Sequence, residues 1–428
     1  MMCRKQLVNA IAAGLLGIAW TAGNPISAQQ SPHPLAPGSV SAVRGQNNLR
    51  AKSPARTASA GSGALAANES TAAAQNSAAP DAEDLILQAH NQAKAAATVE
   101  EFTEALNRCR DALRQPLSEG RKAYVGKLAA WIYMKRGEKL VGLGEELAAQ
   151  ETARAVEYEK IALSDFNLAV KLDDANWRAR YNRGLSYAMI EEYDKSLADL
   201  TMVIEQQPNH KDAHYNRGEV YYQLGQLERA IQDYSATLRL DPQDHAAYSG
   251  RGMSYFELGD YSRALADMNA VLKLDPNSAV AFAQRADVFA ALGQWERAAA
   301  DYRVSLKLDK ALGRALHNVA WLMATCPDKQ FRNGELAVRA ARKAIEVDGA
   351  NFQYLDTLAA ALASAGKFEE ARSVAQKALQ ASPAEEQAGI RQRLALYEAS
   401  RPYRDAQPSV SDSRVRLASG QEELAEPK

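Results

Sequence analysis

Apolar and small side chains recur through the middle of this chain at the three- and four-residue spacing of amphipathic helices. In residues 211–244 one such pattern ends at Gly225, and a second ends before Pro242. Glycine tolerates the left-handed conformation that ends a helix, and proline excludes the helical conformation from the residue before it. The pattern therefore predicts two helices joined by a tight turn. Its apolar and small positions are Tyr215, Gly218, Tyr221, Tyr222 and Leu224 in the first helix, and Leu227, Ala230, Ile231, Tyr234, Leu238 and Leu240 in the second.

This helix pair returns every 34 residues. The sequence Arg-Gly-x-x-Tyr starts at Arg183, Arg217 and Arg251, and a fourth copy with conservative changes starts at Arg285. One hairpin cannot bury its own apolar face, whereas stacked neighbours can, so a period of this length predicts a solenoid. We therefore expect an all-α fold whose core runs as a stripe along the stacked hairpins.

These residues resemble the tetratricopeptide repeat pattern, over roughly residues 85–400 and most strongly in 177–312. The resemblance implies an α-solenoid of stacked helix-turn-helix repeats that forms a right-handed superhelix. Within residues 81–402 we predict a degenerate hairpin at 85–116, a repeat with an insert (145–157) at 130–176, regular repeats at 177–210, 211–244, 245–278 and 279–312, divergent repeats at 313–351 and 352–384, and a capping helix at 385–399.

Each repeated arginine is followed sixteen positions later by an aspartate. The pairs are Arg183 and Asp199, Arg217 and Asp233, Arg251 and Asp267, and Arg285 and Asp301. Facing helices would bring the two side chains together, so we expect structural ion pairs within each repeat. The alternative is an arginine ladder for acidic ligands, but such a site would not need a matched aspartate in every copy.

The first 28 residues resemble a signal peptide, with a positive start, an apolar run from Leu7 to Trp20 and a small-residue cleavage site at Ala28. The run is shorter than the ~20 residues of a membrane span, which favours cleavage over retention as an anchor. We expect an exported protein, periplasmic or extracellular, with no integral membrane span after cleavage.

Composition also indicates which segments fold, whether nucleic acid is a ligand and whether the cysteines pair. Residues 29–80 and 403–428 contain too few large apolar side chains to fold, so we predict a disordered linker and a disordered tail. Lys and Arg number 51 against 52 Asp and Glu, without a basic block, so nothing supports nucleic acid binding. Cys109 and Cys326 are about six repeats apart, too far for a disulfide in an extended solenoid, and we expect two free, mostly buried thiols.

Motifs for catalysis or cofactor binding are missing from the sequence, which has no phosphate-binding loop, no GxSxG and no CxxC. His210 and His214 have the i, i+4 spacing of some metal sites, but no carboxylate motif accompanies them. We expect a solvated helix start there rather than a metal site. The sequence therefore predicts a protein that is not an enzyme and has no cofactor.

In tetratricopeptide proteins the first helix of each repeat lines a concave groove, and the resemblance places eight residues of this chain there. They are Tyr181, Leu185, Tyr215, Glu219, Tyr222, Met253, Phe256 and Glu257. This aromatic wall with a slight acidic excess would suit a peptide with apolar anchors and a Lys or Arg. The alternative interpretation is that the tyrosines only pack between neighbouring repeats.

Two functions remain open. The favoured one is an exported interaction scaffold that holds a partner protein or peptide in the groove. The alternative is a self-assembling structural component of the cell envelope.

Overall fold

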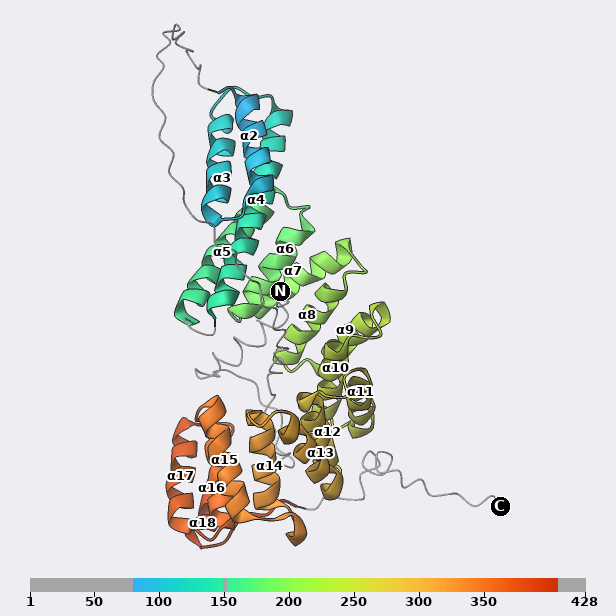
Figure 1. Ribbon diagram of the computed structural model, residues 1–428, viewed down its shortest axis with the longest axis vertical. Helices are drawn as coiled ribbons and strands as arrows, with labels where there is room; N and C mark the ends of the chain where they lie inside the picture. The colour runs from blue at the N-terminus through green and yellow to red at the C-terminus, as the bar shows by residue number, and fades with distance from the viewer. Residues whose placement is uncertain (1–79, 149–151, 407–428) are drawn as a thin grey trace, which may run out of the picture. The chain divides into compact units, whose positions relative to one another are not determined.

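The computed structural model describes residues 80–148 and 152–406, in which the chain forms seventeen α-helices, one short 3-10 helix and no strand (Figure 1). The predicted signal peptide, nearly all of the predicted linker and residues 407–428 of the predicted tail lie outside the described part. The described helices fall into two compact units, divided between Ala179 and Arg180. None of these helices is both long enough and apolar enough to cross a membrane.

The first unit contains two antiparallel helix pairs. They are α2 (Ala82–Ala95) with α3 (Val99–Leu113), and α4 (Glu119–Leu147) with α5 (Thr152–Leu172). The helix α3 begins with a capping box, because Thr98 and Glu101 each bond to the other's backbone N–H. The helix α4 lies close to α5 at Gly137, where a side chain would overlap the ring of Phe166. The predicted insert at 145–157 spans the end of α4 and the start of α5, which are 29 and 21 residues long.

The second unit continues with helix pairs of more uniform length, visible side by side in Figure 1. The first helices of the pairs are α6 (Trp177–Met189), α8 (Lys211–Gln223), α10 (His245–Glu257), α12 (Ala279–Ala291), α14 (Gly313–Thr325) and α16 (Phe352–Ser364). The second helices are α7 (Tyr193–Gln206), α9 (Leu227–Leu240), α11 (Tyr261–Leu274), α13 (Trp295–Leu308), α15 (Gly334–Asp348) and α17 (Phe368–Ala381), and α18 (Gln387–Glu398) follows them. The predicted all-α arrangement of consecutive helix pairs is confirmed.

Glycine and proline end the helices where the sequence pattern predicts. Gly225, Gly259 and Gly293 follow the first helices with φ of 68°, 74° and 71°, a conformation that side-chain-bearing residues rarely adopt. Gly218 lets α8 approach α9, since a Cβ there would lie 3.2 Å from the ring of Tyr234. The turn between α14 and α15 is longer and contains the 3-10 helix η1 (Lys329–Phe331).

Each repeated arginine meets its aspartate through two hydrogen bonds in parallel. In Arg217 the Nε and Nη2 atoms lie 2.7 and 2.9 Å from the carboxylate of Asp233. Equivalent contacts of 2.7–3.0 Å join Arg183 to Asp199, Arg251 to Asp267 and Arg285 to Asp301. The aspartates are buried and the arginines partly buried, so these are structural pairs rather than an exposed ladder.

Three of these arginines also contact the preceding repeat, which the sequence analysis missed. The remaining nitrogen, Nη1, donates to a polar side chain sixteen residues earlier, on the second helix before it. The contacts are Arg217 to Thr201 at 3.1 Å, Arg251 to Ser235 at 3.1 Å and Arg285 to Asn269 at 2.8 Å. Each of these three guanidinium groups therefore joins three helices and connects one hairpin to the next.

Two expectations need correction. His214 is not part of a solvated helix start, because its Nδ1 lies 3.3 Å from Asp233 and its Nε2 lies 3.0 Å from the carbonyl of Pro208. His210 caps α8, accepting from the Ala213 N–H at 3.1 Å. The predicted disordered tail also begins too early, because residues 403–406 lie against α14 through hydrogen bonds from Arg404 and Asp405.

Candidate protein-binding face

Four successive first helices bring side chains into one cluster, which we call the first-helix face. Its members are Tyr222 of α8, Met253, Phe256 and Glu257 of α10, Asp287 of α12, and Arg314 of α14. The Nη2 atom of Arg314 lies 3.0 Å from Asp287 and 3.9 Å from the sulfur of Met253. Tyr222 packs against the cluster of Met253 and Phe256. Side chains separated by up to 92 positions thus meet in one cluster, in which Tyr222 and Glu257 keep accessible surface.

Asp287 is the centre of this cluster. Its carboxylate accepts hydrogen bonds from Tyr302 Oη at 2.5 Å, Asn318 Nδ2 at 2.7 Å and Arg314 Nη2 at 3.0 Å. Burial raises the pKa of Asp287, and the charge of Arg314 and the three donors oppose that rise. The arrangement holds Arg314 in place, with 15% of its side chain exposed.

Of the eight residues that the resemblance placed in a groove, four keep accessible surface. Tyr181, Glu219 and Tyr222 are partly exposed, and Glu257 is exposed. Glu219 also accepts a hydrogen bond of 2.6 Å from the hydroxyl of Tyr234. These side chains, on α6, α8 and α10, are the ones that a partner could reach.

The other four are packed mainly into the interior. Leu185 lies in a core cluster with Leu200, and Tyr215 packs against Tyr234 with ring centroids 5.8 Å apart. Met253 and Phe256 are only 5% and 8% exposed. For these four residues the packing interpretation describes the structure better than the binding interpretation.

Glu257 is electrostatically unusual for an exposed residue. Partial removal from water raises its pKa, with Arg314 opposing the rise and Asp287 adding to it. Arg314 is already engaged by Asp287, and Glu257 forms no ion pair with any residue that the structure describes. A cationic group placed beside Glu257 would therefore relieve an unfavourable environment.

The sequence analysis did not select several residues that extend the first-helix face along α14 and α16. Arg314 occupies the repeat position of Asp212, three periods later, but Ala246 and Val280 hold that position in between, so no recurring residue type marks it. His317 is buried and stacks on Tyr354, with ring centroids 4.6 Å apart and planes 18° apart. Burial lowers the pKa of His317 to about 3, and its Nδ1 has no hydrogen-bond partner among the described residues.

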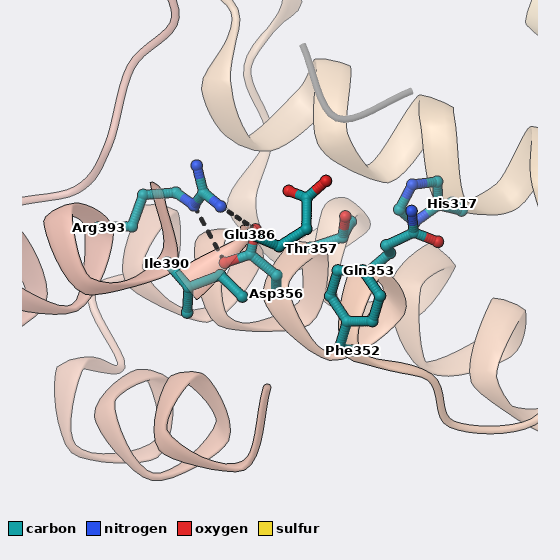
Figure 2. Close-up of a pocket in the computed structure, with 8 residues that line it drawn as sticks. All are labelled: His317, Phe352, Gln353, Asp356, Thr357, Glu386, Ile390 and Arg393. Atoms are coloured by element: carbon teal, nitrogen blue, oxygen red, sulfur yellow. Dashed lines mark hydrogen bonds and ion pairs between the residues drawn. The ribbon is translucent and has the colours of Figure 1, made fainter. Parts of the chain in front are cut away.

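A small hollow lies beside His317, between α14, α16 and α18 (Figure 2). The other residues lining it are Phe352, Gln353, Asp356, Thr357, Glu386, Ile390 and Arg393. Arg393 holds both carboxylate oxygens of Asp356, at 3.0 and 2.6 Å, as the dashed lines in Figure 2 show. The space of about 10 Å³ has room for only a single water molecule. The ion pair between Arg393 and Asp356 attaches α18 to α16 beside it.

Within residues 80–148 and 152–406, no group of three or more His, Cys, Asp or Glu side chains is arranged to hold a metal ion. Cys109 and Cys326 are free and buried, and burial raises the pKa of Cys109 to about 11. The thiolate is the reactive form of cysteine, so burial suppresses the reactivity of Cys109.

Comparisons with known proteins agree with the periodicity. Four family models, described as TPR repeat or tetratricopeptide repeat, match residues 178–210, 200–232, 218–259 and 245–278. Residues 178–278 of the chain are therefore tetratricopeptide repeats. A comparison with curated proteins gave no match.

Solved structures with a similar arrangement include YrrB, described as a TPR protein with an unusual peptide-binding site, which is 22% identical with a TM-score of 0.39 over 52% of this chain and 98% of that one. A tetratricopeptide repeat protein from Parabacteroides merdae is 18% identical, with a TM-score of 0.37 over 74% and 98% of the two chains. Yeast Tom70 is 14% identical, with a TM-score of 0.42 over 77% and 66%.

Proposed function

We propose that this protein is an exported, non-enzymatic scaffold that binds a partner protein or peptide through the first-helix face. The family match supports the general class, because tetratricopeptide repeats are protein-interaction modules. The observation that carries the proposal is the grouping of Tyr222, Glu257 and Arg314 from α8, α10 and α14 on one surface. The expectation of export depends on residues 1–28 alone.

The exposed chemistry of this face indicates the kind of partner. Tyr181 and Tyr222 offer amphipathic rings that give contact area at low entropic cost. Glu219 and Glu257 place carboxylates near Tyr222, and desolvation raises the pKa of Glu257. A segment with an apolar anchor and a neighbouring Lys or Arg fits both features.

The test is capture of partners from the native envelope by the full chain and by two charge-reversed variants. Glu257→Lys changes the first-helix face, whereas Glu228→Lys makes the same change on an exposed position of α9, a second helix. We expect Glu257→Lys to lose the captured partner and Glu228→Lys to retain it. Equal capture by all three chains would place the binding surface elsewhere.

The structure also offers one observation in favour of self-assembly. Leu240, Leu274 and Leu308 lie 34 residues apart near the ends of α9, α11 and α13, and are 40%, 41% and 42% exposed. A row of leucines could contact another copy of the chain. Light scattering of the full chain and of Leu274→Lys, over a range of concentrations, tests this candidate. A concentration-dependent mass that the substitution abolishes would support it.

A further inference from the structure

The described chain ends on the first-helix face itself. After α18 the segment 401–406 lies along the end of α14, where the backbone N–H of Asp405 donates to the Thr325 carbonyl at 2.9 Å. The Arg404 guanidinium donates to the Ala324 carbonyl at 2.8 Å. These carbonyls belong to the last turn of α14 and have no acceptor role inside the helix, so the segment satisfies them.

Side chains of the segment also contact α14. The carboxylate of Asp405 accepts from the Trp321 indole N–H at 2.9 Å and from the Thr325 hydroxyl at 2.5 Å. The ring of Tyr403 lies 5.9 Å from that of Trp321, and the guanidinium of Arg393 lies 5.6 Å from both ring centroids. An aromatic anchor, a hydrogen-bonded carboxylate and backbone pairing are the contacts of a bound peptide.

The repeat register shows that this is the same face. Trp321 of α14 occupies the position of Asp287 in α12, one period earlier, and Thr325 occupies that of Ala291. Asp405 also lines a small hollow together with Ala290 and Ala291 of α12. The described chain therefore stops beside α12, the helix that carries Asp287.

The sequence after Asp405 contains basic and apolar residues that complement the acidic and aromatic side chains of α8 and α10. Residues Arg414, Val415, Arg416 and Leu417 alternate basic and apolar side chains, whereas α8 and α10 present Tyr222, Glu219 and Glu257. Arg414 lies nine residue steps after Asp405, which allows a span of up to about 30 Å in an extended chain. Packed helices are about 10 Å apart, so α10 and α8 lie within reach.

We propose that the C-terminal segment 403–417 is a resident ligand of the first-helix face. Residues 403–406 anchor it on α14, and Arg414 and Arg416 bind the carboxylates of Glu257 and Glu219. A partner protein must then displace this segment, so the face is occupied until the partner competes for it. This inference rests on the proposed function only in using the same face.

Cross-linking in the full chain tests the proposal directly. Arg414→Cys is combined with Glu257→Cys on the face, or with Glu228→Cys on α9 as the control, in a Cys3→Ser background. The native Cys109 and Cys326 are buried and react slowly. We expect the 257–414 disulfide to form at least tenfold faster than the 228–414 disulfide, measured by peptide mass spectrometry under mild oxidation. Equal rates would overturn the proposal.

Binding in trans gives a second measurement. A fluorescein-labelled peptide of residues 407–428 should bind a chain that ends at Ala406 at least tenfold more tightly than the full chain, in which the tethered segment competes at high effective concentration. A peptide with Arg414→Glu and Arg416→Glu should lose this binding. Equal binding of the two peptides would contradict the inference.

The two proposals fail separately. If the cross-link rates are equal while Glu257→Lys still abolishes partner capture, the face binds partners but not its own C-terminal segment. If the 257–414 disulfide forms quickly while Glu257→Lys captures partners normally, the resident segment is real and the proposed partner site is wrong.

Discussion

Arg314 and Asp287 form an ion pair between the first helices of two successive repeats, with Nη2 and Oδ2 separated by 3.0 Å. The regular pairs connect the two helices of one repeat, whereas this one connects α14 to α12. It occurs in the repeat where the regular pair is missing, because position 319, one period after Arg285, is a valine. A different pair of residues thus supplies a charged contact where the pattern diverges.

The regular pairs should show the energetic signature of buried charges. Asp267→Ala leaves Arg251, a mostly buried guanidinium, without its carboxylate, and we expect a loss of about 3–5 kcal/mol of unfolding free energy. Adding Arg251→Met removes the stranded charge and should restore part of the loss. Urea unfolding of both variants measures this difference. If the double variant is at least as unstable as Asp267→Ala, the pair is not acting as a buried charge pair.

Stability should depend on pH through His317. Its pKa is about 3 in the folded chain, against about 6.5 in an unfolded chain. Between these values the unfolded state binds one more proton, so the free energy of unfolding falls as the pH falls from 6.5 towards 3. By pH 4 this contribution amounts to about 3 kcal/mol.

The variant His317→Phe keeps a ring against Tyr354 but cannot titrate. We expect it to lose about 3 kcal/mol less than the original chain between pH 7 and pH 4, measured by urea unfolding at each pH. If the unfolding free energies of the two chains changed equally with pH, protonation of His317 would not destabilise the folded state.

Two neighbouring aromatic residues should respond differently to truncation. Phe256 is mainly buried, so Phe256→Ala should lower the unfolding free energy by about 3–5 kcal/mol. Tyr222 is partly exposed, and Tyr222→Ala should weaken partner binding by at least about 2 kcal/mol, roughly thirtyfold in the dissociation constant. Unfolding curves and titrations with the captured partner separate the two effects. Normal binding by the Tyr222 variant would exclude this ring as an anchor.

Export gives a prediction that is independent of the fold. If the apolar run from Leu7 to Trp20 directs secretion, the mature chain begins at Gln29. N-terminal sequencing of the protein from its native source checks this. Recovery of an intact Met1 in a membrane fraction would show an anchor instead of a cleaved signal.

The helix pairs and their turns could be predicted because the same residue types recur at the same positions in successive repeats. Gly225, Gly259 and Gly293 are equivalent, so one interpretation served for all three. The contacts between repeats were missed because the acceptors vary in type. Thr201, Ser235 and Asn269 share a position but not a side chain.

The candidate site was harder to predict for the same physical reason. The position of Arg314 is held by Asp212, Ala246 and Val280 in the preceding repeats, so periodicity carries no information about it. Spacing along a helix also does not decide depth, and Tyr215 proved to be buried against Tyr234. The contact between Trp321 and Asp405 joins residues 84 positions apart outside any period.

The contacts of these arginines with their own repeat and with the preceding one determine which repeats can be inserted or deleted. Arg285 uses Asp301 ahead of it and Asn269 behind it, both at sixteen residues. Excision of 245–278 as a block would bring Ser235 to the place of Asn269, and Arg217 and Arg285 would each keep a carboxylate and a neutral acceptor. Loss of 279–312 would instead remove Asp287 and leave Arg314 facing Met253. Duplication and deletion in the genome can therefore act on the interior repeats as interchangeable units, while the junction before α14 must be inherited intact.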